Sequence, residues 1–166
     1  MALTRAILIG GAALTGAAAG LEVDHQPRPA GLAGSAAAIL LLLGGHRANH
    51  GAGSYTERML DALLDRIWDG VVLGAIAWAA RDAAPAVAGA ALVALGASFL
   101  SSYIRARGAS LGYSVEESHI TRGARYGLVV LSLLLRNAFW PLAASATIAV
   151  LASAVRSTQV LKEERV

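Results

Sequence analysis

The chain alternates long apolar runs with short polar links. A membrane-spanning helix needs about 20 mainly apolar residues to cross a hydrocarbon core of ~30 Å, and about 17 at the short end. Six runs reach or approach this length, and segments containing Pro, Gly or charged residues separate them. We place the six helices at residues 4–21, 29–45, 57–80, 84–107, 121–136 and 139–156. They fill most of residues 1–166, so the pattern predicts a single all-α domain, an integral membrane six-helix bundle.

The composition narrows the class of protein. Of the 166 residues, 56% are hydrophobic and 15% are charged, which argues against an ordinary soluble domain. The net charge of +3 comes from basic residues scattered between apolar runs, so we expect no nucleic-acid partner. The absence of cysteine excludes disulfides and thiolate chemistry. We expect the first run to be a membrane helix rather than a signal peptide, because no small-residue cleavage site follows it.

The basic residues also predict the orientation of the helices. In a six-helix arrangement, ten arginine and lysine residues fall on the side that holds both termini. Only Arg28, Arg81 and Arg136 fall on the opposite side. Because basic residues accumulate on the cytoplasmic side, both termini and the polar link 105–125 are expected in the cytoplasm. The sequence thus indicates a multi-pass protein of the cell membrane.

Four acidic residues recur at every fourth position in the third apolar run. Glu57, Asp61, Asp65 and Asp69 therefore share one face of the predicted helix. An ionised side chain exposed to the bilayer interior is costly, so these carboxylates must face a water-filled cavity, a cation or a basic side chain. One interpretation is a ligand-facing cavity, open to the cytoplasm, that Asp61, Asp65 and Asp69 line. The other is a set of ion pairs between helices.

Arginines near the predicted helix ends are the candidate partners of these acids. For the ion-pair interpretation, Arg66 and Arg105 are the candidates. Arg105, Arg122 and Arg125 are also candidates for a pocket that binds a phosphate or an anionic headgroup, because the guanidinium fork matches pairs of anionic oxygens. Cytoplasmic arginines are equally expected from membrane topology alone, so both interpretations of these residues stay open.

The acidic run carries a resemblance to a known family. Asp61-x3-Asp65-Arg66-x2-Asp69 resembles the second half of the CDP-alcohol phosphatidyltransferase signature, D-x2-D-G-x2-A-R-x8-G-x3-D-x3-D. The segment 102–107 (Ser-Tyr-Ile-Arg-Ala-Arg), with Arg122 and Arg125, is similar to the phosphatidylinositol-phosphate synthase branch. The resemblance implies a six-helix membrane fold, Asp61 and Asp65 as ligands of Mg²⁺ or Mn²⁺, and Asp65 as the base that deprotonates the acceptor hydroxyl.

The first half of the signature is not matched. Counted back without gaps, its two aspartates fall on Leu40 and Leu43, and its Ala-Arg pair falls on Arg47-Ala48 in reversed order. Leucine offers no oxygen to a metal, so we expect an incomplete site. Glu57 is the expected additional ligand. His46 and His50, spaced i, i+4, are alternative nitrogen ligands or simply polar residues at the membrane interface.

Three functions follow as hypotheses. The first is a divergent CDP-alcohol phosphatidyltransferase-like protein of phospholipid biosynthesis that binds membrane lipid, a CDP-linked lipid or CMP. It has little or no activity alone, needs no cofactor, and forms a homodimer or accompanies an active transferase. The second is an active transferase that uses Mg²⁺ or Mn²⁺ and releases CMP. The third is a small cation channel or transporter.

Overall fold

The computed structural model describes residues 2–50, 53–113 and 119–163. Within these ranges the chain is helical except for short turns and caps. The elements, in chain order, are α1 (Ala2–Val23), α2 (Pro27–His50), α3 (Tyr55–Trp68), the π-helical turn η1 (Asp69–Leu73), α4 (Gly74–Ala80), α5 (Pro85–Ser110), α6 (His119–Leu134) and α7 (Phe139–Glu163). The expected all-α architecture is confirmed.

Helices α3 and α4 are two parts of one rod. The residues that join them to η1 keep right-handed helical backbone angles, with φ and ψ of −58° and −51° at Trp68 and of −66° and −34° at Leu73. The rod therefore runs without a break from Tyr55 to Ala80. Counted this way, the described chain forms the six helices that the hydropathy pattern predicts.

The bounds differ from the prediction most at the ends of α7, which continues to Glu163 rather than residue 156, and of α2, where the difference bears on the site. This helix continues to His50, whereas the sequence interpretation ended it at residue 45 and treated 46–56 as a polar link. That assignment was wrong for residues 46–50. The segment is polar but contains no proline, and the Asn49 side-chain amide donates back to the Gly45 carbonyl at 2.8 Å within the helix. Polarity alone does not end a helix when no residue interrupts its hydrogen bonds.

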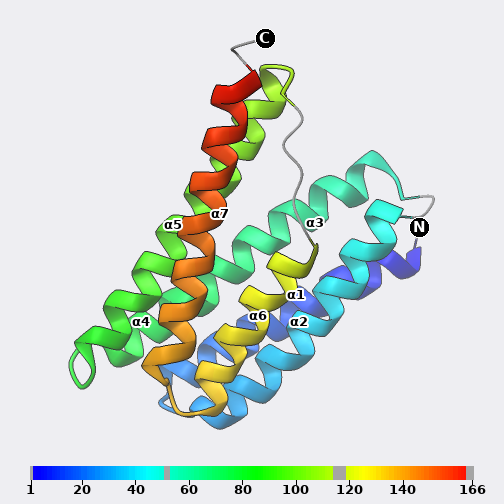
Figure 1. Ribbon diagram of the computed structural model, residues 1–166. Helices are drawn as coiled ribbons and strands as arrows, with labels where there is room; N and C mark the ends of the chain where they lie inside the picture. The colour runs from blue at the N-terminus through cyan, green and yellow to red at the C-terminus, as the bar shows by residue number, and fades with distance from the viewer. Residues whose placement is uncertain (1, 51–52, 114–118, 164–166) are drawn as a thin grey trace.

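The turns gather at the two ends of the bundle. Figure 1 shows the turns α1–α2, α4–α5 and α6–α7 at one end, while the two chain termini lie toward the other end. The break expected near residue 136 is present, because Arg136 and Asn137 both adopt left-handed backbone angles, with φ of 60° and 62°. Helix α1 packs along α2, α5 packs along α7, and α6 lies against both α2 and α7.

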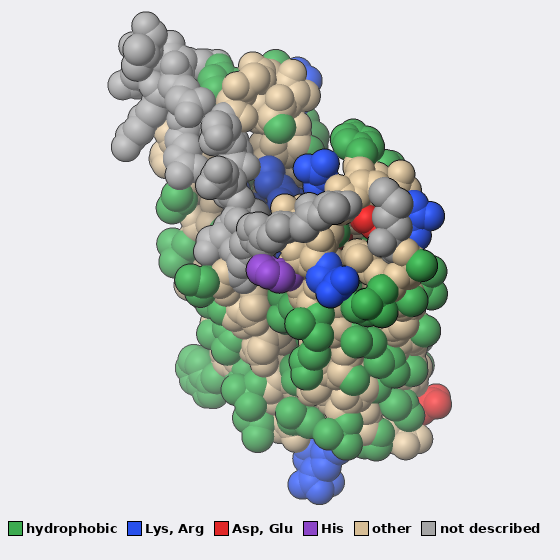
Figure 2. Space-filling view, turned by 90° about the vertical axis from the view of Figure 1, so that its right-hand side faces the viewer, with side chains coloured by type: hydrophobic (Ala, Val, Ile, Leu, Met, Phe, Trp, Pro, Cys, Tyr) green, Lys and Arg blue, Asp and Glu red, His purple; other side chains and the backbone are tan. Residues whose placement is uncertain are grey.

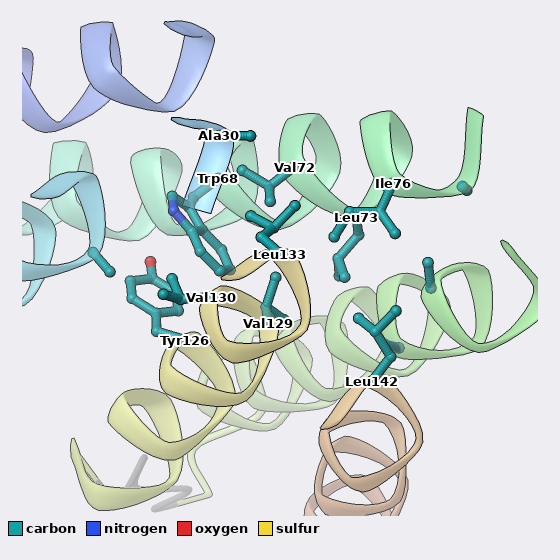
Figure 3. Close-up of a cluster of buried hydrophobic side chains, with 14 of the residues drawn as sticks. Ala30, Trp68, Val72, Leu73, Ile76, Tyr126, Val129, Val130, Leu133 and Leu142 are labelled. Carbon is teal, nitrogen blue, oxygen red and sulfur yellow. The ribbon is translucent and has the colours of Figure 1, made fainter. Parts of the chain in front are cut away.

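An apolar core joins α6 to the α3–η1–α4 rod. The Trp68 ring stacks on the Tyr126 ring with centroids 4.1 Å apart. Figure 3 shows this pair beside Val129 and Leu133, which continue the contact along α6. Trp68 is fully buried, so it packs inside the bundle and is not an anchor at the membrane interface. This core therefore fixes which part of α6 lies beside the acidic face of α3.

The outer surface suits a lipid environment. In the described part of the chain, four helices are long and apolar enough to cross a membrane: α1, α2 as far as Asn49, α5, and α7 as far as Thr158. Two of the six predicted spans do not meet that criterion, since α6 has only 16 residues and the α3 part of the rod carries charged residues. Figure 2 shows hydrophobic side chains covering the flank of the molecule, with basic groups near its two ends.

Candidate functional site: an arginine-paired acidic face

Glu57 starts the acidic helix. The Ser54 hydroxyl accepts a hydrogen bond from the Glu57 backbone N–H at 3.2 Å, and the Glu57 carboxylate accepts one from the Ser54 N–H at 2.9 Å. This reciprocal capping box stabilises the first turn of α3. The second Glu57 oxygen lies 3.9 Å from Nε of Arg5. Glu57 thus has a structural role in α3, and its expected role as a metal ligand remains a prediction.

Asp61 is held by a forked pair. Nη1 and Nη2 of Arg122 each donate to a different Asp61 oxygen at 3.0 Å. The Asn49 amide on α2 donates to the same carboxylate at 3.1 Å. Asp61 and Arg122 are both buried, at 4% and 7% exposure. A bidentate, charge-assisted pair in a buried position is among the strongest polar contacts that side chains make.

Asp65, one turn further along α3, is contacted from three sides. The Tyr126 hydroxyl donates to its Oδ1 at 2.6 Å, and Nε of Arg122 lies 2.9 Å from the same oxygen as an ion-pair contact. Its Oδ2 accepts from Nη2 of the neighbouring Arg66. Arg122 therefore bridges Asp61 and Asp65. Both Asp65 oxygens thus have a partner, and the expected role of Asp65 as the base remains a prediction.

Asp69 lies deeper, where η1 begins. Its Oδ2 accepts from the Ser98 hydroxyl on α5 and from Nη2 of Arg125 on α6. Nη1 of Arg66 lies 3.3 Å from the same oxygen and donates to Ser98 Oγ at 2.8 Å. Asp69 is 1% exposed. Single π-helical turns are frequent at functional sites, and this one lies where the acidic face meets α5 and α6.

These contacts bear on the two interpretations of the acidic face. The shared face is confirmed, because Asp61, Asp65 and Asp69 are all buried on the same side of the rod. Each of the three carboxylates is paired with at least one arginine, as the ion-pair interpretation requires. Arg66 is a partner as expected. The other main partners, Arg122 and Arg125, were expected to hold an external anion instead.

A polar pocket opens beside the first two pairs. It has a volume of about 220 Å³. Its lining comes from α2, α3, α5 and α6: Asn49, Arg58, Asp61, Ala62, Asp65, Arg105 and Arg122. Arg105 and Arg122 thus line the pocket, and their expected binding of a phosphate or an anionic headgroup stays a prediction. Arg125 and Asp69 do not line it, because Ser98 holds both of them deeper in the bundle.

Several residues of the site were not identified from the sequence. Arg58 falls one residue after Glu57, on a neighbouring face of α3, and looked like an ordinary cytoplasmic arginine. Asn49 was assigned to a link rather than to a helix. Tyr126 lies four positions after Arg122 and therefore on the same face of a helix. This spacing was the signal that could have identified it as a residue of the site. Ser98 sits in a long apolar run and carries no such signal.

The structure also corrects the position of the missing aspartates on α2. Leu43, where the gapless count puts the second one, is 52% exposed on the outer surface. Leu40 packs against α1, with its Cβ only 3.4 Å from where a Cβ on Gly11 would lie. The face of α2 that meets the acids instead carries Gly45 and Asn49: a Cβ on Gly45 would lie 2.5 Å from Asp61 Oδ1. Counting back along the sequence without gaps therefore does not place the first two signature aspartates on the face of α2 that meets the acids.

The donor set does not fit a divalent metal in this arrangement. Among the described residues, no group of three or more His, Cys, Asp or Glu side chains is placed to hold a metal ion. Both Asp61 oxygens accept from Arg122, and Glu57 is engaged at the helix cap. The side chain of His50 lies outside the described residues, and His46 is exposed on α2. Metal ligation by Asp61, Asp65 and Glu57 thus remains a prediction from the resemblance.

The sequence of this chain is similar to that of a known protein. The chain is 35% identical over 108 residues to the phosphatidylinositol phosphate synthase of Corynebacterium glutamicum, a match that spans 63% of this chain and 49% of the relative. The chain thus matches about half the length of that relative. No family model matches the sequence.

Solved structures share the fold. Phosphatidylinositol phosphate synthase of Mycobacterium tuberculosis in apo form aligns with a TM-score of 0.76 and 21% identity over 97% of this chain and 95% of that chain. The form with CDP-DAG bound gives a TM-score of 0.72 and 21% identity over 95% and 85%. Together with the acidic and arginine motifs, these likenesses support the resemblance: the chain shares the fold of the solved phosphatidylinositol phosphate synthases and is similar in sequence to one such synthase over 108 residues.

Proposed function

We propose that this chain is a divergent CDP-alcohol phosphatidyltransferase-like protein of phospholipid biosynthesis. In this proposal its pocket binds the phosphate-bearing head of a CDP-linked lipid or CMP. The chain alone does not carry out metal-dependent transfer. The observation that carries the proposal is the polar pocket, in which Arg58 and Arg105 lie beside carboxylates that Arg122 already pairs.

The charge of the pocket favours an anion. Arg58, Arg105 and Arg122 contribute three positive charges against the two negative charges of Asp61 and Asp65. Arginine binds pairs of phosphate oxygens through its planar fork, and such charge-assisted contacts are stronger than neutral ones. The volume of about 220 Å³ is below the ~300–1,000 Å³ typical of sites for drug-sized ligands. It therefore suits a phosphate-bearing headgroup rather than a whole lipid.

The lipid portion has a place outside the pocket. The flanks of the bundle are apolar and expose large side chains such as Leu32 and Ile9, at 67% and 62% exposure. A lipid in the bilayer keeps its acyl chains along such a surface while its headgroup enters from the interface. The structure of the M. tuberculosis synthase is described with CDP-DAG bound, which supports testing the same ligand here.

A binding experiment tests this function directly. The purified chain in lipid nanodiscs is titrated with CDP-diacylglycerol and with CMP in the presence of EDTA. Arg58→Gln and Arg105→Gln each remove one pocket cation and are expected to weaken binding by about ten- to a hundredfold, from ~1.5–3 kcal/mol per charged hydrogen bond. Arg28→Gln is the matched control and should leave binding unchanged, because Arg28 lies at the start of α2, distant in the sequence from the residues that line the pocket. Equal binding by all variants would disprove the pocket assignment.

A second measurement separates binding from catalysis. CMP release from CDP-diacylglycerol is followed with a panel of alcohol acceptors, with Mg²⁺ or Mn²⁺ and with EDTA. We expect no metal-dependent release above background from the chain alone. EDTA-sensitive release that Asp65→Asn abolishes would instead establish the chain as an active transferase. Association with a second copy or with an active transferase, expected from the sequence, stays a prediction that co-purification would test.

A further inference from the structure

Arg122 occupies the position between two carboxylates that a bridging cation would take. Its Nη1 and Nη2 contact the two oxygens of Asp61 at 3.0 Å, and its Nε lies 2.9 Å from Asp65 Oδ1. The side chains of all three residues are less than one-tenth exposed. A single guanidinium thus joins two acidic residues one helical turn apart.

The surrounding cluster is already balanced in charge. Asp65 also pairs with Arg66, and Asp69 pairs with Arg66 and Arg125. Asp61, Asp65 and Asp69 carry three negative charges, and the three arginines carry three positive charges. A divalent cation would add two further positive charges to this buried group and would compete with Arg122 for the same Asp61 oxygens. Burying uncompensated charge is strongly unfavourable.

Arg122 is also held in place from its own helix. Its guanidinium lies 5.6 Å from the centre of the Tyr126 ring, one turn along α6. The Tyr126 ring is in turn stacked on the buried Trp68, and its hydroxyl donates to Asp65. The position of the cation is thus fixed by the core that joins α6 to α3. Arginine suits this role better than lysine, because its fork matches both oxygens of one carboxylate at once.

We infer that Arg122 is a built-in cation that replaces a divalent metal at Asp61 and Asp65, and that its removal uncovers a metal-binding site. This inference extends the proposed function. It rests on that function only for the anionic ligand of the pocket. The replacement itself stands on the contacts of Arg122. It implies that the pocket presents its cationic face to an anion without any added metal.

The test measures Mn²⁺ binding to the whole chain in nanodiscs by electron paramagnetic resonance of the free ion. The unmodified chain and Asp61→Asn should bind Mn²⁺ equally weakly. Arg122→Gln removes the charge and the fork, and should bind Mn²⁺ at least about tenfold more tightly than the unmodified chain, a difference of ~1.4 kcal/mol. The double variant Arg122→Gln with Asp61→Asn should lose this gain. Arg81→Gln, at the exposed pair with Asp82, is the matched control and should show no gain.

Two results would overturn the inference. One is Mn²⁺ binding by the unmodified chain that Asp61→Asn abolishes. The other is a folded Arg122→Gln variant, with an unchanged thermal transition, that gains no affinity. If Arg122→Gln does not fold, the comparison of the unmodified chain with Asp61→Asn decides alone: equal, weak binding supports the inference, and binding that depends on Asp61 refutes it. If the unmodified chain does not bind CDP-diacylglycerol in EDTA, the proposed function is refuted. The conclusion drawn from Mn²⁺ binding is not affected by that outcome.

Discussion

Gly45 on α2 lies directly against the carboxylate of Asp61 on α3. A Cβ at position 45 would be 2.5 Å from Asp61 Oδ1 and 2.9 Å from Asp61 Oδ2. Only a residue without a side chain lets α2 approach the acidic face this closely. The same approach brings Asn49, one turn later, within hydrogen-bonding distance of Asp61. The close contact between α2 and α3 is therefore part of the site and not only of the fold.

Gly45→Ala is expected to disrupt this contact. The added methyl group must displace Asp61, whose two oxygens are held by Arg122, or push α2 away from α3. Overpacking of this kind typically costs ~1–3 kcal/mol. We expect lower thermal stability in detergent and weaker CDP-diacylglycerol binding.

Gly16→Ala provides the matched control for this prediction. In the described part of the chain, nothing lies within 4 Å of a Cβ at position 16, which is exposed on α1. Alanine favours a helix over glycine by roughly 0.8–1 kcal/mol, so this variant should be as stable as the unmodified chain or more so. A Gly45→Ala variant that gains stability in the same way would mean that α2 does not press against Asp61.

Removal of one hydroxyl tests the contact between Tyr126 and Asp65. Tyr126→Phe keeps the ring that stacks on Trp68 but deletes the donor that lies 2.6 Å from Asp65 Oδ1. A hydrogen bond to a charged group contributes ~1.5–3 kcal/mol, so we expect a loss of that order in the free energy of unfolding. Tyr103→Phe, at a 66% exposed position, should change stability by less than ~0.5 kcal/mol. Equal effects of the two substitutions would contradict the contact.

Much of the fold could be predicted from the hydropathy pattern. The positions of the six helices follow from runs of about 20 apolar residues, and the break near Arg136 follows from polar residues placed before Pro141. The end of α2 was missed, because the polar residues after position 45 were taken as a link although nothing there interrupts helical hydrogen bonding. The π-helical turn at Asp69 was also missed. Helical periodicity does not distinguish one π turn within a continuous helix.

The candidate site was only half predictable. The spacing of Asp61, Asp65 and Asp69 fixes their common face, since residues four apart lie on one side of a helix. Their partners depend on which helices pack against that face, and this is set by contacts such as that between Trp68 and Tyr126. Such contacts join residues distant in the chain and leave no local pattern. The gapless count did not locate the face of α2 that meets the acids for the same reason. The orientation of one helix relative to the next depends on contacts between them and cannot be derived from the sequence of either helix alone.

A buried acid near the turn-bearing end of the bundle provides a further test. Glu22 is 1% exposed, and its Oε1 accepts from the Asn137 amide at 2.5 Å. Glu22 Oε2 and Asn137 Oδ1 have no hydrogen-bond partner among the residues that the structure describes. Glu22→Ala leaves the Asn137 amide without its acceptor and should cost ~1–3 kcal/mol. Glu22→Gln retains an acceptor and adds N–H donors, so it should be at least as stable as the unmodified chain.

Thermal unfolding in one detergent compares these variants. Asp24→Ala, two residues away and exposed, is the control and should change stability by less than ~0.5 kcal/mol. A Glu22→Gln variant as unstable as Glu22→Ala would show that the charge of Glu22, and not its hydrogen bond to Asn137, stabilises this end of the bundle.

The orientation expected from the arginines is open to a labelling experiment. The chain has no native cysteine, so single cysteines report their own position. Leu111→Cys follows α5, and Asp82→Cys lies in the turn before it. Leu111 is preferred to the adjacent Gly112, whose φ of 90° does not suit a side chain. In right-side-out vesicles an impermeant maleimide should label position 82 and not position 111. Labelling of both from one side would rule out the predicted topology.

The position of α2 makes a last prediction about the missing aspartates. If the gapless count were right, Leu40→Asp with Leu43→Asp would restore a metal site beside Asp61. In the structure, Leu43 is 52% exposed on the outer surface and Leu40 packs against Gly10 and Gly11 of α1. We therefore expect the double variant to bind Mn²⁺ no better than the unmodified chain. It should also be less stable, since an acid at the centre of a membrane helix costs ~2.5–3.5 kcal/mol on insertion scales.

A neutral pair of substitutions separates charge from shape in this test. Leu40→Asn with Leu43→Asn matches the aspartates in size, so any difference in Mn²⁺ binding between the two double variants comes from the carboxylates. A gain in Mn²⁺ affinity that needs both the new aspartates and Asp61 would contradict the prediction. It would mean that α2 turns residues 40 and 43 toward the acidic face, and that the family's metal site is recoverable in this chain by two substitutions.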